Sequence, residues 1–151
     1  MGRKHTVSKI YPVSAQVLWE DILDPNALAE SMKGSLTYSG LPTEPVYEGQ
    51  RIVVSIKRWG WFPMGRWTME VVRRDDEGRV LESREFGSLV RNFQHRLEVE
   101  SLGDSEARYS DHLDLDAGLF TILLLPTFVS MYERRHEQRL KRVLSSKPSP
   151  Y

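Results

Sequence analysis

The stretch Ala117–Tyr132, AGLFTILLLPTFVSMY, is an apolar run that a basic segment, ERRHEQRLKRVL (133–144), follows directly. Such a run could be a membrane anchor, a buried core element or the lid of a binding site. Spanning a bilayer takes about 20 apolar residues, whereas this run is shorter and contains Pro126. Because the charges behind it are mixed in sign, we predict a continuing helix there and at most peripheral membrane contact. We place the start of this helix at Pro126 and its end near Leu144.

Composition predicts one globular domain over residues 1–145, followed by a flexible tail, 146–151. The chain has 21 basic and 21 acidic residues, so no net positive field favours a nucleic-acid partner. It contains no cysteine, which excludes disulfides and thiolate chemistry and fits a reducing compartment. The first residues carry no secretory signal pattern. We therefore expect a soluble cytoplasmic protein.

The remaining elements are predicted from periodicity and turn residues. Ser14 and Asp24 are candidate N-caps for two short helices. Period-two alternation then predicts a long antiparallel meander, with turns at DDEG (75–78) and GDSE (103–106). Six or seven strands are expected in all, at about 5–13, 35–40, 50–59, 65–75, 79–87, 89–102 and 107–118.

This order of elements resembles the START-like superfamily of polyketide cyclases, dehydrases and lipid-transport proteins (SRPBCC). The residues that carry the resemblance are PVSAQVLWEDILDPNALAESMKG (12–34) and HRLEVESLGDSEARYSDHLDLDAG (95–118). The resemblance implies an α+β helix-grip fold, in which a curved antiparallel sheet wraps around a long C-terminal helix. It also implies an apolar cavity between the sheet and that helix.

Ionisable residues share a face with apolar ones in the predicted sheet. Arg91, His95 and Asp111 alternate in phase with the inward-facing apolar residues of the last two strands, so we predict that they face the cavity. Asp111 should lie opposite Leu97 or Val99, within reach of His95. Glu85 is a further candidate, and His136 lies in the apolar stripe of the last helix. The predicted ligand-binding residues are Ile52, Val54, Trp67, Met69, Glu85, Arg91, Phe93, His95, Asp111, Phe128, Tyr132 and His136.

These residues favour binding of a hydrophobic or amphipathic small molecule, such as a lipid or a polyketide-like compound, over catalysis. The alternative is a cyclase, aromatase or dehydrase in which His95 and Asp111 form a general base. No nucleophile motif is present, and the four histidines lack metal-ligand spacing, so neither a metal nor a cofactor is expected.

Two surface features keep a third alternative open, namely a protein-interaction regulator. The predicted hairpin tip carries Trp59, Trp61 and Phe62, which could be a gate, a membrane contact, a cover of the cavity or a homodimer contact. The last helix carries Arg134, Arg135 and Arg139, which could bind an acidic partner.

Overall fold

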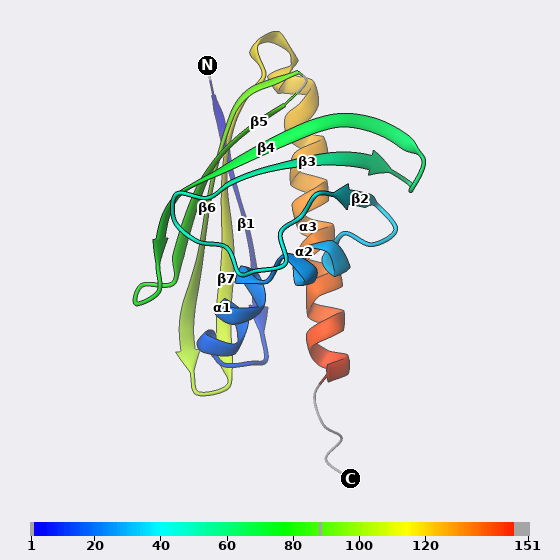
Figure 1. Ribbon diagram of the computed structural model, residues 1–151. Coiled ribbons are helices and arrows are strands. Elements are labelled where there is room, and N and C mark those ends of the chain that lie inside the picture. Colours follow the sequence, from blue (N-terminus) through cyan, green and yellow to red (C-terminus); the bar gives the residue numbers. More distant parts are fainter. Residues whose placement is uncertain (1, 88, 147–151) are drawn as a thin grey trace.

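The computed structural model describes residues 2–87 and 89–146, and a seven-stranded antiparallel sheet curves around a long C-terminal helix (Figure 1). Across the sheet the strand order is β1-β7-β6-β5-β4-β3-β2. The predicted α+β helix-grip fold is therefore confirmed, whereas the predicted tail, apart from Ser146, lies outside the described residues. The elements are β1 (Arg3–Tyr11), α1 (Ala15–Leu23), α2 (Pro25–Ser31), β2 (Leu36–Ser39), β3 (Arg51–Arg58), β4 (Phe62–Asp75), β5 (Val80–Gly87), β6 (Val90–Gly103), β7 (Glu106–Asp116), a 3-10 turn (Gly118–Phe120) and α3 (Thr121–Ser146).

The two short helices begin where the sequence predicts. The side chain of Ser14 accepts a hydrogen bond from the backbone N–H of Val17, and that of Asp24 accepts one from Asn26. These bonds satisfy amide groups that the first turn of a helix leaves free. Pro25 follows at the first position of α2, where its missing amide costs nothing.

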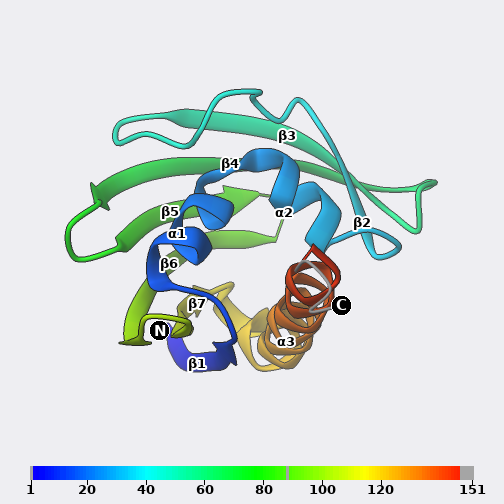
Figure 2. The same ribbon diagram turned by 90° about the horizontal axis from the view of Figure 1, so that it is seen from below.

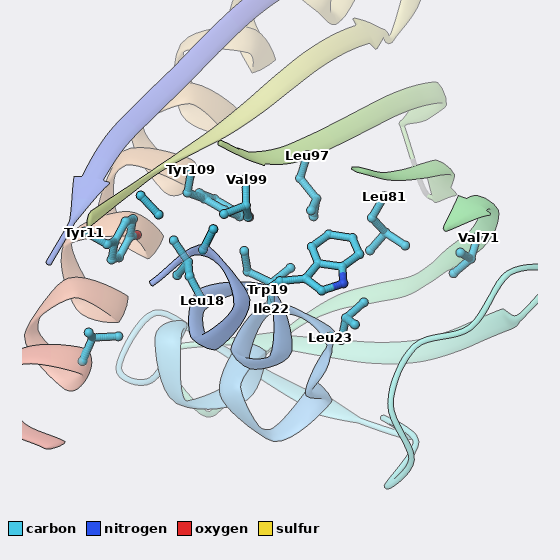
Figure 3. Close-up of a cluster of buried hydrophobic side chains, with 13 residues drawn as sticks. Tyr11, Leu18, Trp19, Ile22, Leu23, Val71, Leu81, Leu97, Val99 and Tyr109 are labelled. Atoms are coloured by element: carbon cyan, nitrogen blue, oxygen red, sulfur yellow. The ribbon is translucent and has the colours of Figure 1, made fainter. Parts of the chain in front are cut away.

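Helix α1 buries its apolar face against the sheet. Leu18 and Trp19 are almost completely buried and pack against residues of β4 to β7, among them Leu97 and Tyr109 (Figure 3). The indole N–H of Trp19 donates to Asp76 in the turn after β4. Seen from below, α1 and α2 lie across the space between the sheet and α3 (Figure 2). This packing closes one end of the fold.

Strands β6 and β7 form the long hairpin that the pattern predicts. Leu97 pairs with Asp111 and His95 pairs with Leu113, so the predicted register is confirmed. β1 then pairs with the outer edge of β7 and brings Tyr11 opposite Ala107. Residues of β1 and β7 thereby lie beside α3.

Helix α3 begins five residues earlier than predicted, at Thr121 instead of Pro126. The hydroxyl of Thr121 accepts from the backbone N–H of Ala117 and donates to the carbonyl of Gly118, which fixes the first turn. Pro126 therefore lies inside the helix and removes one amide donor. Packing of Leu124, Leu125 and Phe128 against the sheet offsets this cost. No helix in the described part of the chain is both long and apolar enough to cross a membrane.

Replacing Leu18 tests how far α1 stabilises the fold. Leu18→Ala should lower the free energy of unfolding by about 2–5 kcal/mol, because it leaves a cavity in a closed core. The matched control is Val17→Ala on the same helix, where the side chain is 55% exposed and the change should stay within about 0.5 kcal/mol. Urea denaturation measures both, and equal losses in the two variants would contradict this role of α1.

Candidate functional site

A cavity of about 650 Å³ lies between the concave face of the sheet, the short helices and α3. Its volume is in the range of sites that hold small molecules. One wall is aromatic, since Trp67 and Phe128 approach with ring centroids 6.1 Å apart and Phe93 packs against both. Further apolar side chains complete the lining, including Ile22, Leu28, Leu36, Leu41, Val46, Ile56, Val71, Leu81, Leu97 and Met131.

Most of the predicted binding residues line this cavity, and four do not. The residues that line it are Ile52, Trp67, Met69, Glu85, Phe93, His95, Phe128 and Tyr132. Val54 shares their face of the sheet but is buried opposite Trp67, and the larger indole forms the wall there. Asp111 and His136 are buried and do not reach the cavity; they are hydrogen-bonded to each other.

The prediction that Arg91 faces the cavity is wrong. Gly87 pairs with Val90, whereas Glu85 pairs with Phe93, so β6 has one extra residue at this point. Such a bulge shifts the alternation of side chains between the two faces. Val90 and Phe93 both point inward, and Arg91 is exposed, with its guanidinium beside Gly118.

Asp111 is the centre of a buried hydrogen-bond network. It is 0% exposed, and one carboxylate oxygen lies 2.6 Å from Nε2 of His95 and accepts from the hydroxyl of Tyr109 at 2.9 Å. The other oxygen lies 2.6 Å from Nε2 of His136. Nδ1 of His136 lies 2.9 Å from the hydroxyl of Tyr11. The network therefore joins β1, β6, β7 and α3.

Glu85 forms the part of this polar wall that meets the cavity. It accepts hydrogen bonds of 2.7 Å from the indole N–H of Trp67 and from the hydroxyl of Ser83. Its Oε1 also lies 3.7 Å from Nδ1 of His95. Both nitrogens of His95 thus face carboxylates, one in Glu85 and one in Asp111.

The electrostatics of this arrangement favour a charged His95. Burial alone would lower the pKa of His95, but Asp111 and Glu85 outweigh it and raise the pKa to about 9. Burial alone would raise the pKa of Asp111, but the charge of His95 and the hydrogen bonds from both histidines hold that pKa well below its usual range. The pKa of Glu85 is lowered in the same way, against the effect of burial. A carboxylate, an imidazolium and a second carboxylate therefore lie in a row.

This row limits what His95 can do chemically. A general base needs a nitrogen free to take a proton from a bound molecule. Both ring nitrogens of His95 are directed at carboxylates, and its ring packs against Phe93 and Tyr132 with centroids 5.8 and 4.9 Å away. The geometry suits a fixed positive charge in the wall better than a proton acceptor.

Helix α3 contributes the arginines that the sequence analysis considered as a surface for an acidic partner. Arg139 is only 3% exposed and forms an ion pair with Asp21 of α1, which Arg142 also contacts at 2.5 Å. Arg135 lines the cavity, and its guanidinium lies 4.4 Å from the ring centroid of Tyr132. Of the three arginines considered for an acidic partner, only Arg134 is exposed.

The polar residues of the site that were absent from the predicted set include Tyr11, Tyr38, Tyr109 and Arg135. Tyr109 and Arg135 lay in phase with inward residues, which is a usable signal. The sequence contains no such signal for Tyr11 or Tyr38, because each meets α3 from a strand that is distant in the sequence.

Exposed apolar side chains surround the opening of the cavity, and we call them the apolar rim. They come from the β3–β4 tip, the β5–β6 turn and the start of α3, and each of these segments also lines the cavity, through Met64, Leu89 and Leu124. Trp61 is 70% exposed and Leu119 is 97% exposed. The aromatic tip therefore does not cover the cavity. The rim consists of Trp59, Trp61, Phe62, Met64, Leu89, Leu119, Phe120, Ile122 and Leu123.

Asp111→Asn tests the network. The variant should lose about 3–5 kcal/mol of stability, because it removes the partner of a buried charge. In the wild type, the stabilisation from His95 is complete below pH 6.5 and is lost as the pH rises through about 9. The wild type should therefore lose about 3 kcal/mol between pH 6 and 10, and the variant much less.

Urea unfolding at several pH values measures this difference, and Asp114→Asn on the other face of β7 is the matched control. A control as unstable as Asp111→Asn, or an unchanged pH dependence in Asp111→Asn, would contradict the role of the network.

Comparisons with known proteins support the fold. No protein-family model and no curated protein sequence matches the chain. Solved structures do match. Norcoclaurine synthase from Thalictrum flavum, in complex with dopamine and hydroxybenzaldehyde, has a TM-score of 0.76 at 12% identity, over 99% of this chain and 90% of that one.

Two further structures match over nearly their full length. The Zhui aromatase/cyclase from Streptomyces sp. R1128 has a TM-score of 0.67 at 16% identity, over 96% of this chain and 93% of that one. The allergen Ara h 8.0201 has a TM-score of 0.73 at 9% identity, over 97% of this chain and 100% of that one. All three share the helix-grip fold with this chain.

Proposed function

We propose that this protein binds a hydrophobic or amphipathic small molecule in the cavity between the sheet and α3, and that it carries or sequesters this molecule without altering it. The observation that carries the proposal is the cavity itself, about 650 Å³ in volume and lined mainly by aliphatic and aromatic side chains. A protein interior is normally packed without voids of this size. A space of this kind is therefore best explained by a molecule that fills it.

The aromatic wall supports a ligand with a substantial apolar body. Trp67, Phe93 and Phe128 form one continuous surface on which rings or chains can pack. Burial of apolar surface contributes about 25 cal/mol per Å² before ordering costs. Affinity would come mainly from this wall, and the polar side chains at the other wall would set the orientation of the ligand.

An enzymatic function of the cyclase or dehydrase kind finds less support. Two of the structural neighbours are named as enzymes, but a likeness at 12% and 16% identity supports the fold alone. The proposed base, His95, has both nitrogens directed at carboxylates. A purely structural role for this charged row explains its geometry without any reaction.

The apolar rim supports exchange of the ligand at a lipid surface. Its three segments, 51–69, 86–97 and 117–132, contain no aspartate or glutamate. They carry six exposed basic residues: Arg51, Lys57, Arg58, Arg66, Arg91 and Arg96. Apolar side chains with basic neighbours and no acidic ones complement a membrane that contains anionic lipid. The ligand would then pass between the membrane and the cavity at the place where the rim contacts lipid.

Filling the cavity tests the binding proposal. Native mass spectrometry of freshly purified protein should detect an apolar molecule bound to the wild type. Met69→Trp should abolish this adduct, because Met69 lines the cavity and the larger side chain occupies the ligand's space. The matched control is Val72→Trp on the exposed face of the same strand, which should keep the adduct. An adduct of equal abundance in both variants would place the molecule outside the cavity, and a changed mass after incubation would favour an enzyme.

Vesicle co-sedimentation tests the rim. Trp61→Ser combined with Leu123→Ser should weaken binding to phosphatidylcholine/phosphatidylglycerol vesicles by at least about tenfold, since burying one such side chain contributes about 1.5–3 kcal/mol. Pure phosphatidylcholine vesicles should bind the wild type more weakly. Val72→Ser, which is exposed elsewhere, is the control. If the wild type does not bind vesicles but forms a dimer that the double variant cannot form, the rim is a homodimer contact instead.

A further inference from the structure

Arg135 brings a positive charge into the wall of the cavity. Its guanidinium stacks on the ring of Tyr132, 4.4 Å from the centroid. Burial raises the pKa of the Tyr38 hydroxyl on β2, and the nearby charge of Arg135 opposes this rise. Among the residues that the structure describes, no carboxylate lies within ion-pair distance of Arg135.

The Nε of Arg135 is shielded from solvent and has no hydrogen-bond acceptor. The Nε atoms of Arg79, Arg139 and Arg142 are also buried without an acceptor. Arg135 differs from them because it lines the cavity and has no carboxylate partner, which indicates a missing acceptor.

The neighbouring carboxylates are already engaged. Glu85 receives hydrogen bonds from Trp67 and Ser83 and lies against the charged His95. Asp111 accepts from three side chains and is fully buried. Neither can serve as the partner of Arg135 without giving up bonds that it already has.

Arg139, one turn further along α3, provides the contrast. It also lines the cavity, but Asp21 neutralises its charge. Taken together, the lining contains five arginines against two carboxylates, Asp24 and Glu85. The cavity is therefore positive overall, and Arg135 is the arginine placed among tyrosines instead of beside an acid.

We infer that the ligand is an amphipathic anion whose carboxylate, or an equivalent acidic group, binds the guanidinium of Arg135 beside the hydroxyl of Tyr38, with its apolar body against Trp67, Phe93 and Phe128. This inference rests on the proposed binding function and specifies its ligand class. An arginine held by stacking loses little side-chain freedom on binding and can present two donors to a carboxylate.

Matched pairs of acid and alcohol test the charge requirement. The probes are decanoate with 1-decanol and 2-naphthoate with 2-naphthalenemethanol, each pair with one apolar body, titrated by isothermal calorimetry below any micelle concentration. The wild type should bind each acid at least about tenfold more tightly than its alcohol, as expected for hydrogen bonds to a charged group. Arg135→Met should lose this preference but keep its affinity for the alcohols.

Three further variants locate the effect. Arg135→Lys should keep part of the preference, because it keeps the charge but not the planar donors. Tyr38→Phe should reduce it a few-fold. Lys141→Met, an exposed change on the same helix, should leave it intact. Unchanged circular dichroism and melting temperature would show that the variants are folded.

The outcomes separate the two proposals. Equal affinity of the wild type for acid and alcohol, or a preference that survives in Arg135→Met, overturns the anionic ligand and leaves hydrophobic binding in place. Failure of all four probes to bind overturns both.

Discussion

The carboxylate of Asp111 accepts hydrogen bonds from β6, β7 and α3, and through His136 it is connected to Tyr11 of β1. A buried carboxylate is costly unless it is fully paired, and here every bond that pairs it also ties two elements together. These hydrogen bonds fix α3 against β1 and β7, at one side of the sheet. The sheet then curves away from the helix through β5, β4 and β3. The cavity is the space that this one-sided attachment leaves open.

The same network determines the character of the polar wall. His95 lies between two carboxylates and carries a positive charge that the apolar surroundings alone would not permit. Because its nitrogens are engaged, its charge is balanced within the wall. The charge of Arg135 is further from any acid and faces the cavity instead. His95 and Arg135 are both cations, but they have different roles, because carboxylates lie against His95 and no carboxylate of the described residues lies within ion-pair distance of Arg135.

Local pattern was enough to predict most of the fold. Alternation in β6 and β7 gave the pairing of Leu97 with Asp111, because one face of the hairpin is buried and only one register matches. The pattern failed where the backbone departs from its period. The extra residue in β6 turned Arg91 outward, and Pro126 hid the true start of α3. The pairing of Arg139 with Asp21 joins the last helix to the first, so no local pattern contained it.

The carboxylate of Asp21 has a mechanical consequence. It forms ion pairs with both Arg139 and Arg142, which hold α1 against α3 at the end of the fold that α1 and α2 already close. At the opposite end, the first turns of α3 have no comparable ion pair among the described residues. Motion of α3 relative to the sheet would therefore be smallest at the end held by Asp21 and largest at its first turns. A molecule wider than the resting opening could then enter only if the first turns of α3 move away from the sheet.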